Sequence, residues 1–267
     1  MISGRARVFA ILGDPVSHSL SPAMHNAAFR ALGLDAAYVP LPCRTDDVAP
    51  LLRGLARAGG GGNVTVPHKE AAARAVDRLE PRAALLGACN TFWAEDGCAA
   101  GDNTDVAGLL EALDQLEPPP SGWLVAGTGG AARAVVGAAR ERGAPLAIRS
   151  RAPARAQAFA AWAASLGVVA ADPARCGVLI NATPLGLSRN DPAPIPPDCA
   201  PDAVVALDLV YAVGETHWVQ LLRRRGLRAA DGRTMLVAQG AAAFERWFPG
   251  MKAPREIMRA TVNAVLR

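Results

Sequence analysis

Lysine is almost absent from this chain of 267 residues, although basic side chains are not. Only two of the 28 basic residues are lysines, Lys69 and Lys252, and the rest are arginines. The net charge is +4, and the arginines are scattered except for the run 223–225, which fits the solvated face of an amphipathic helix. Because the sequence shows neither a basic face nor an aromatic platform, we expect no binding to nucleic acid.

Cysteine and long apolar runs are also scarce. The five cysteines form no C-x-x-C pair, and neither they nor the four histidines have the spacing of a metal site, so we expect no metal. The odd cysteine count without a signal peptide predicts reduced thiols and a cytoplasmic protein. No apolar run reaches the ~18 residues of a membrane span. With 51% hydrophobic and 19% charged residues, the chain has the composition of a globular protein.

Strand-like apolar runs alternate with helix-period segments along most of the chain. This alternation is typical of parallel β-α-β units and predicts an α/β fold. The proline-rich stretch 117–122 (EPPPSG) interrupts the pattern and predicts a linker, after which a second α/β unit begins. The expected strands are 7–12, 36–42, 62–66, 123–127, 145–150, 177–181 and 203–209; the expected helices are 22–33, 46–58, 68–78, 129–142, 153–166, 233–248 and 253–267; and 188–202 is an expected loop.

The segment 123–140 (WLVAGTGGAARAVVGAAR) has the glycine spacing of a dinucleotide-binding turn. Gly127 permits the tight turn after a strand, Gly129 lets a pyrophosphate approach the backbone, and Ala132 keeps the next helix close to the strand. The helix N-terminus offers free N–H groups and partial positive charge to phosphates. A glycine-rich turn without a ligand would have the same spacing, but the strand before it and the helix after it favour nucleotide binding.

The next expected strand indicates which dinucleotide is bound. Enzymes that prefer NAD commonly end this strand with Asp or Glu, which takes the ribose 2′-hydroxyl. Here 148–155 reads IRSRAPAR, without a carboxylate and with Arg149, Arg151 and Arg155 close together. Guanidinium groups suit a 2′-phosphate, so the sequence favours NADP over NAD.

Lys69 stands in the stretch 63–69 (NVTVPHK), after a strand-like run and a proline. Pro67 cannot donate a ladder hydrogen bond, so the strand ends and a helix begins with Lys69 in its first turn. The helix dipole opposes a cation at this end, which suits proton exchange better than a structural role. The alternative is a solvated lysine offset by Glu70, and we expect the adjacent His68 to be a surface residue.

Four polar residues, from Asp102 to Asp105, precede an apolar helical run in the stretch 101–113 (GDNTDVAGLLEAL). One of them would suffice to cap the helix, so the group holds more polar atoms than capping requires. A carboxylate beside Lys69 would hold its ammonium in place, but the sequence leaves open whether Asp105 meets it.

A further polar segment, 13–26 (GDPVSHSLSPAMHN), contains three serines. Ser21 and Pro22 fit the N-cap and the first position of a helix, which accounts for that pair structurally. Ser19 has no such role, so its hydroxyl is free to face a polyol.

Together these motifs resemble those of shikimate dehydrogenases over essentially the whole chain. SHSLSP, NVTVPHK, GACNT, GDNTD, GTGGAAR, NATPLG, DLVY and DGRTMLVAQ occur in the family's order. The resemblance implies an NADP-dependent, reversible reduction of 3-dehydroshikimate to shikimate in aromatic amino-acid biosynthesis, by a monomer or homodimer. It also implies a split substrate domain, 1–106 with 234–267, around an inserted Rossmann-type NADP-binding domain, 107–233.

The resemblance also implies roles for single residues. Lys69 resembles the family's general acid/base and Asp105 its partner; together they pass the proton to and from the alcohol oxygen while hydride passes to the carbonyl carbon. Ser19 and Ser21 match the pair that binds the substrate carboxylate. Other positions match contacts to the substrate ring (Thr65, Asn90, Tyr211, Gln239), to the cofactor pyrophosphate (Gly127, Thr128, Gly129, Gly130, Ala131), to the adenosine ribose phosphate (Ser150, Arg151, Arg155) and to the nicotinamide side (Thr183, Leu209, Gly232).

The chain departs from the family's pattern in three places. The family usually has Asn-Arg-Thr where this chain has Ser-Arg-Ala at 150–152, so hydrogen bonds to NADP are lost and weaker affinity is expected. Thr128 replaces the usual alanine and Val106 a common glycine, and neither touches a reacting group. Two alternatives stay open: a quinate/shikimate dehydrogenase of broader specificity, and a non-catalytic protein that senses shikimate-like ligands.

Overall fold

The computed structural model describes residues 2–188 and 190–267. The chain divides into two compact units, which we call unit 1 (Met1–Gly108 with Leu236–Val265) and unit 2 (Leu109–Met235 with Leu266–Arg267). Both main divisions fall inside helices, α5 (Asp105–Asp114) and α9 (Arg233–Trp247). A continuous helix carries no turn signal in its sequence, so composition could not reveal these positions. The proline-rich stretch 117–122 lies within unit 2, where 117–121 form a loop and Gly122 begins β7 (Gly122–Ala126).

Unit 1 contains a six-stranded mixed sheet. Its elements are β1 (Arg7–Gly13), α1 (Ser21–Ala31), β2 (Ala36–Pro42), α2 (Val48–Arg57), β3 (Gly61–Val64), α3 (Lys69–Ala75), β4 (Arg78–Leu79), α4 (Pro81–Leu86), β5 (Thr91–Glu95), β6 (Cys98–Asp102) and α10 (Arg255–Val265). The strand order is β2-β1-β3-β5-β6-β4. The first three strands are parallel, whereas β5 is antiparallel to both β3 and β6. The expectation of parallel pairing was therefore wrong for β5, whereas β4 and β6 are again parallel.

The antiparallel pairing follows from a tight hairpin between β5 and β6. Asp96 and Gly97 have φ values of 50° and 79°, the left-handed conformations of a two-residue hairpin turn, and Asp-Gly is the sequence typical of that turn. The signal was thus present in the sequence, but the strands on either side are short and were not predicted.

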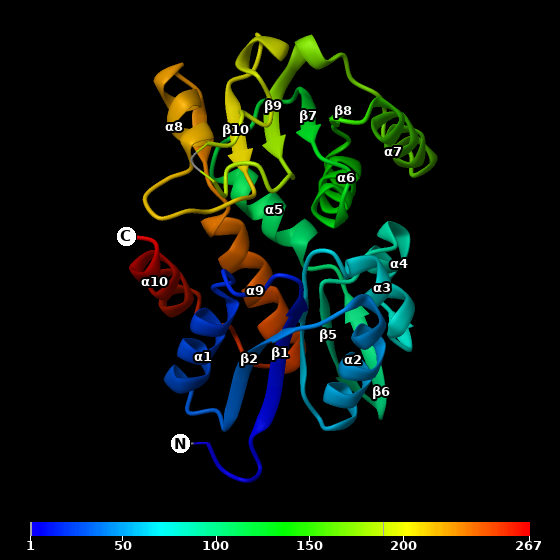
Figure 1. Ribbon diagram of the computed structural model, residues 1–267, viewed down its shortest axis with the longest axis vertical. Coiled ribbons are helices and arrows are strands. Elements are labelled where there is room, and N and C mark those ends of the chain that lie inside the picture. Colours follow the sequence, from blue (N-terminus) through cyan, green and yellow to red (C-terminus); the bar gives the residue numbers. More distant parts are fainter. Residues whose placement is uncertain (1, 189) are drawn as a thin grey trace. The chain divides into compact units, whose positions relative to one another are not determined.

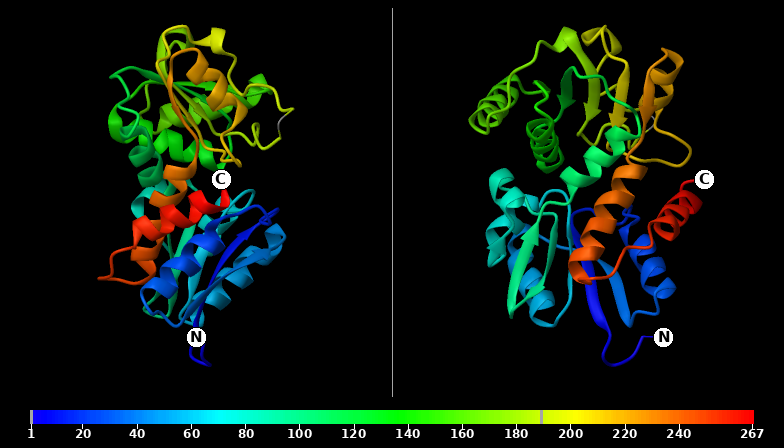
Figure 2. Two further views of the ribbon diagram at one scale, coloured as in Figure 1. Left: turned by 90° about the vertical axis from the view of Figure 1, so that its left-hand side faces the viewer. Right: turned by 180° about the vertical axis from the view of Figure 1, so that it is seen from behind.

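Helices cover both faces of the unit 1 sheet (Figures 1 and 2). Successive side chains of β1 point to opposite faces. Phe9 packs against Phe29 of α1 and Trp247 of α9, with ring centroids 5.4 and 4.9 Å away. Ala10 and Leu12 belong to a buried cluster shared with α2 and α3. A strand buried on both faces has a continuous apolar run, here residues 8–12, which is why 7–12 was recognisable as a strand.

Unit 2 contains a five-stranded sheet that is parallel throughout. Its elements are β7 (Gly122–Ala126), α6 (Gly130–Arg142), β8 (Leu146–Arg149), α7 (Pro153–Ser165), β9 (Cys176–Asn181), β10 (Val205–Asp208), α8 (His217–Arg224) and β11 (Arg228–Ala230). The order β11-β10-β9-β7-β8 is a doubly wound arrangement that reverses between β7 and β9. Open α/β sheets bind ligands where the order reverses, beyond the carboxyl ends of the strands.

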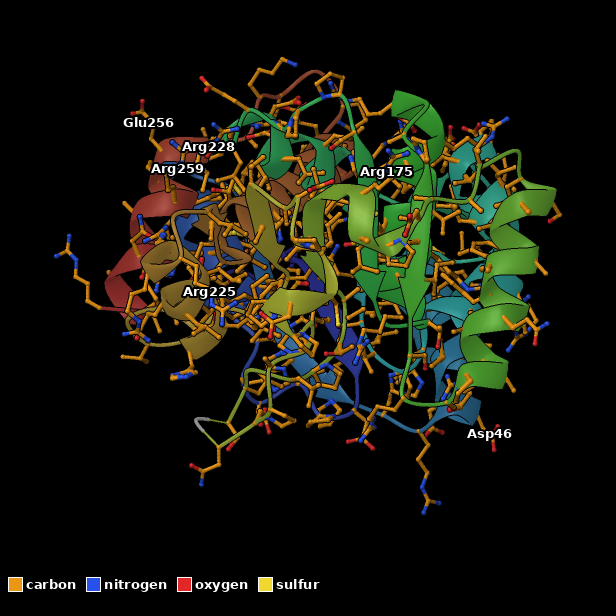
Figure 3. All side chains as sticks on the ribbon, turned by 90° about the horizontal axis from the view of Figure 1, so that it is seen from above. Asp46, Arg175, Arg225, Arg228, Glu256 and Arg259 are labelled. Carbon is orange, nitrogen blue, oxygen red and sulfur yellow. The ribbon has the colours of Figure 1, made fainter. Side chains whose placement is uncertain are left out.

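The arginine run 223–225 closes α8, whose opposite face is buried through Trp218, Val219 and Leu222. Arg225, labelled in Figure 3, is exposed and pairs with Asp198 at 3.1 Å. The run is therefore on the solvated face of an amphipathic helix, as predicted. Within the described part of the chain, none of the helices combines the length and the apolar character needed to cross a membrane.

His25 of α1 is a fully buried histidine in the core of unit 1. The rings of Tyr38 and Trp247 lie 4.7 and 4.8 Å from it, and neither ring nitrogen has a hydrogen-bond partner among the described residues. Burial lowers the pKa of His25 to about 3, from an ordinary value of 6.5. Because the folded state disfavours the proton that the unfolded chain accepts, the stability from neutral His25 is complete above pH 6.5 and is lost as the pH falls toward 3.

We expect the replacement His25→Leu to flatten this acid sensitivity. In the wild type, His25 alone should lower the free energy of unfolding by about 1.4 kcal/mol for each pH unit below about 6.5. The leucine variant should match the wild type at neutral pH or exceed it, because two unpaired buried nitrogens are removed. Urea midpoints measured between about pH 4 and pH 7 test this. The variant His18→Gln is the control, because His18 is exposed. If the free energy of unfolding fell equally with pH in the wild type and in His25→Leu, the prediction would be contradicted.

Candidate active site

Lys69 is the first residue of α3 and so lies in the first helical turn, as the sequence predicted. β3 ends at Val64, and the partly buried Thr65 begins the turn, accepting a hydrogen bond from His68 N at 2.8 Å. His68 is not a surface residue: it is 2% exposed, with Nε2 2.8 Å from the carbonyl oxygen of Cys43. That expectation was wrong because the chain after β2 folds over the start of α3, which fixes the first turn that carries Lys69.

Lys69 and Asp105 meet inside unit 1. Lys69 Nζ lies 2.5 Å from Asp105 Oδ2, and the two side chains are only 11% and 7% exposed. The other carboxylate oxygen, Oδ1, accepts a hydrogen bond from Asn90 Nδ2 at 2.7 Å. Asn90 is itself oriented, because its Oδ1 accepts from Thr104 N at 2.8 Å. The carboxylate is thus held from two sides, and a buried ammonium has its charge balanced in a fixed geometry.

The polar residues before α5 form the connection that leads into Asp105, the first residue of that helix. Asp102 accepts from Asn103 N at 2.7 Å and from Arg246 at 2.9 Å. Asn103 donates to the carbonyl oxygen of Ala88 at 3.0 Å, and Thr104 bonds to the side chain of Asn90. These hydrogen bonds join the segment before α5 to neighbouring segments of unit 1. The polar side chains therefore do more than cap the helix.

Ser19 and Ser21 lie together at the start of α1. The helix begins at Ser21, and Leu20 occupies the N-cap position, so the prediction of Ser21 as N-cap was wrong. Met24 N donates to Leu20 O at 3.0 Å and so extends the helix by one residue. Ser21 N lies 3.3 Å from Ser19 Oγ, and the buried Ser21 hydroxyl bonds to Tyr38.

Buried polar side chains connect Ser21 to Asn90, and the sequence analysis missed them. Burial raises the pKa of Tyr38 well above its ordinary value, so the phenol stays protonated and its hydroxyl bonds to Asn63 Oδ1 at 2.8 Å. Asn63 Nδ2 lies 3.0 Å from Thr91 Oγ1, which lies 3.1 Å from Asn90 Oδ1. Polar residues inside apolar strands must find such partners, and that was the available signal. Gln239 of α9 reaches the same network, with Oε1 3.4 Å from Asn90 Nδ2.

The glycine turn after β7 has the geometry of a phosphate cradle. Gly127 has φ +115°, and a Cβ there would lie 2.6 Å from Ala182 O, so another residue would be strained and would clash. At Gly129, a Cβ would meet nothing within 4 Å, so the space is open. Gly129 is the N-cap of α6, and no side chain caps the helix there. Thr128 completes the turn, and Gly130 and Ala131 begin α6. The site fits the pyrophosphate of a dinucleotide.

The segment after β8 presents two arginines to solvent. Arg151 and Arg155 are exposed and form no ion pair with any residue that the structure describes. Ser150 Oγ accepts from Ala152 N at 3.3 Å, and Arg155 N donates to Ala152 O at 3.0 Å, which shapes the turn into α7. Unpaired guanidinium groups at this position fit a 2′-phosphate.

The residues expected near the nicotinamide gather at the carboxyl ends of β9 and β10. Thr183 N donates to Asn181 Oδ1 at 3.0 Å, and Leu209 N donates to Asn181 O at 3.0 Å. Gly232 approaches so closely that a Cβ would lie 2.4 Å from Leu209 O. Tyr211 follows two residues after Leu209, in unit 2, while the other expected substrate contacts belong to unit 1.

These two units define a class of protein. A parallel sheet with a phosphate cradle and free arginines is typical of a dinucleotide-dependent oxidoreductase, and a buried lysine–aspartate pair is suited to exchanging a proton.

Comparison with known proteins identifies the family. The model of the shikimate dehydrogenase substrate binding domain matches residues 11–92, and that of the shikimate 5′-dehydrogenase C-terminal domain matches 232–262. A shikimate dehydrogenase (NADP(+)) of Moorella thermoacetica is 41% identical, over 93% of this chain and 90% of the relative; one from Geobacter metallireducens is 39% identical, over 100% and 99%. The chain belongs to the shikimate dehydrogenase family.

A solved structure from the same family shows the same fold. The shikimate 5-dehydrogenase of Thermus thermophilus, crystallised with NADP(H) and shikimate, superposes with a TM-score of 0.88 at 37% identity, and the match covers 100% of both chains. The fold class predicted from the sequence, two α/β parts with a Rossmann-type sheet, is confirmed.

Proposed function

We propose that the protein catalyses the NADP-dependent, reversible reduction of 3-dehydroshikimate to shikimate. The observation that carries the proposal is the buried pair Lys69–Asp105, held at 2.5 Å in unit 1. A sensor of shikimate-like ligands would have no use for a buried pair that can exchange a proton. The two relatives described above are both named shikimate dehydrogenase (NADP(+)), which supports the same substrate and cofactor.

In the direction of reduction, Lys69 Nζ donates a proton to the carbonyl oxygen, and in oxidation it takes the proton back from the alcohol. Asp105 balances the charge of the Lys69 ammonium and holds it in place. The hydrogen bond from Asn90 in turn fixes the orientation of the Asp105 carboxylate. When bound, the reduced cofactor NADPH would supply the hydride for the carbonyl carbon, and in the reverse reaction NADP⁺ would accept it from the alcohol carbon. General acid/base catalysis of this kind contributes about 10²–10⁴-fold to the rate.

Unit 1 would supply most of the substrate contacts, and unit 2 would supply the cofactor contacts. Ser19 and Ser21 would bind the substrate carboxylate, and Thr65, Asn90 and Gln239 its hydroxyls, with Tyr211 as a further contact. Unit 2 would hold the pyrophosphate at 127–131 and the 2′-phosphate at Arg151 and Arg155. On this assignment, the substrate domain is 1–106 with 234–267, and the NADP-binding domain is 107–233.

An absorbance assay for reduced nicotinamide tests the proposal with four mixtures, shikimate or quinate with NADP or NAD. We expect fast turnover with shikimate and NADP alone. The preference for NADP is expected because Arg151 and Arg155 are exposed and the segment 148–155 has no carboxylate for a ribose hydroxyl. Comparable rates with quinate would favour the alternative of broader specificity. Binding of shikimate without turnover in any mixture, by folded protein, would instead favour the sensor.

A further inference from the structure

Asp208 is a buried carboxylate of unit 2 that has no role in the proposed chemistry. It ends β10 and is 0% exposed, and burial raises its pKa to about 6. Three groups donate to it: Asn181 Nδ2 at 2.8 Å and Val210 N at 3.1 Å to Oδ1, and Thr216 Oγ1 at 2.7 Å to Oδ2. Burying a charge is costly, and these three donors offset that cost.

The first donor shapes the loop after β9. Asn181 donates to Asp208 and also to Leu185 O at 2.8 Å. Its Oδ1 accepts from Thr183 N at 3.0 Å and from Thr183 Oγ1 at 2.7 Å. Gly186, at φ +110°, ends this tight turn, and a Cβ there would lie 3.5 Å from Asp208 Oδ2. The carboxylate therefore holds the amide that sets the position of Thr183.

The other two donors fix both ends of the loop after β10. Val210 N binds Asp208 at the start of that loop, and Val210 O accepts from Gly232 N at 3.0 Å. Thr216 binds Asp208 at the far end, where it is the N-cap of α8 and accepts from Val219 N at 3.3 Å. Leu209 lies inside the segment that these bonds hold.

We propose that Asp208 is a positioning residue for the nicotinamide end of the cofactor. It ties together the loops after β9 and β10, so that Thr183 and Leu209 keep the shape that receives the ring. This inference rests on the proposed binding of NADP by unit 2. The 2′-phosphate end depends on Arg151 and Arg155, which follow the edge strand β8. Strands β9 and β7 separate β8 from β10, which carries Asp208. Loss of Asp208 should therefore weaken binding of the nicotinamide end of the cofactor and leave binding of the 2′-phosphate end unchanged.

Calorimetric titration of the whole chain with two ligands separates these ends. NADP engages both, whereas adenosine 2′,5′-bisphosphate carries the 2′-phosphate end without a nicotinamide. For Asp208→Asn, which keeps the side-chain shape but removes the charge, we expect Kd for NADP to rise on the order of tenfold, as for one lost charge-assisted hydrogen bond. Kd for the bisphosphate should change by less than about twofold, within the usual small effect of a distant site.

Thr216 provides an independent pair of variants. Thr216→Val removes the hydroxyl that donates to Asp208 and should reproduce the selective loss, whereas Thr216→Ser keeps the hydroxyl and should restore NADP binding. Asp172→Asn is the matched control, because Asp172 is an exposed carboxylate of the same unit. Among the described residues, its side chain accepts only from the nearby Ala174 N, at 3.0 Å. It should bind both ligands as the wild type does.

Two results would overturn the inference. Equal weakening of NADP and of the bisphosphate would show that Asp208 merely supports the fold of unit 2, and unchanged binding of both would show that it has no role at the site. A wild-type protein that binds neither ligand would instead refute the proposed use of NADP, so the two failures are distinguishable.

Discussion

The replacement Lys69→Ala is expected to lower kcat by about 10²–10⁴-fold while leaving shikimate affinity within about tenfold of the wild type. The reason is that Lys69 acts on a proton whose transfer occurs only in the transition state, and the other expected substrate contacts remain. Initial rates with saturating shikimate and NADP give kcat, and titration of shikimate monitored by tryptophan fluorescence gives the affinity.

The variant also leaves Asp105 buried without its cation, which costs about 3–5 kcal/mol of stability. The double variant Lys69→Ala/Asp105→Asn removes that uncompensated charge and should regain stability without regaining activity. Lys252→Ala is the natural control, because Lys252 is the only other lysine and its side chain is 91% exposed. Turnover of Lys69→Ala near the wild-type rate would rule out Lys69 as the general acid/base.

The double replacement Arg151→Ala/Arg155→Ala is expected to abolish the preference for NADP. Each guanidinium that binds a phosphate contributes about 1.5–3 kcal/mol, so KM for NADP should rise about 10²-fold or more. Activity with NAD, which has no 2′-phosphate, should stay close to its original level. Steady-state kinetics with both cofactors measure the change as a ratio of kcat/KM values.

An exposed arginine of the same unit supplies the control for charge alone. Arg175, labelled in Figure 3, lies just before β9 at the opposite end of the sheet's strands. Arg175→Ala lowers the net charge without touching the expected cofactor site, so its preference for NADP should equal that of the wild type. If the activities with NADP and with NAD fell equally in the double variant, Arg151 and Arg155 would not be the residues that bind the 2′-phosphate.

Short-range features of the chain were predictable because a few consecutive residues fix them. Gly127 with its neighbours predicted a strand-turn-helix, and the structure has that turn, with a φ value and a close approach that only glycine allows. Pro67 predicted the end of a strand and placed Lys69 in a first helical turn, which is confirmed. Such features depend on local backbone geometry, so they can be deduced from a single sequence.

Features that depend on more than one segment were predicted less well. The antiparallel β5 was missed although Asp96 and Gly97 marked the turn, because short strands carry little periodicity. His68 was wrongly expected at the surface. It is buried by the chain near Cys43, which lies 25 residues earlier, and its neighbours in the sequence give no sign of that contact. The divisions of the chain inside α5 and α9 left no trace in composition.

The sequence by itself determined the α/β class, the glycine turn after β7, the arginines without a carboxylate after β8 and the place of Lys69 at the start of a helix. Only the tertiary structure decided that Lys69 meets Asp105, 36 residues further along the chain, and that Asn90 orients the carboxylate of Asp105. It alone revealed Asp208 as the common acceptor of two loops. The physical reason is that a turn or a helix start depends on neighbouring residues, whereas contacts between distant residues depend on the order in which strands pair.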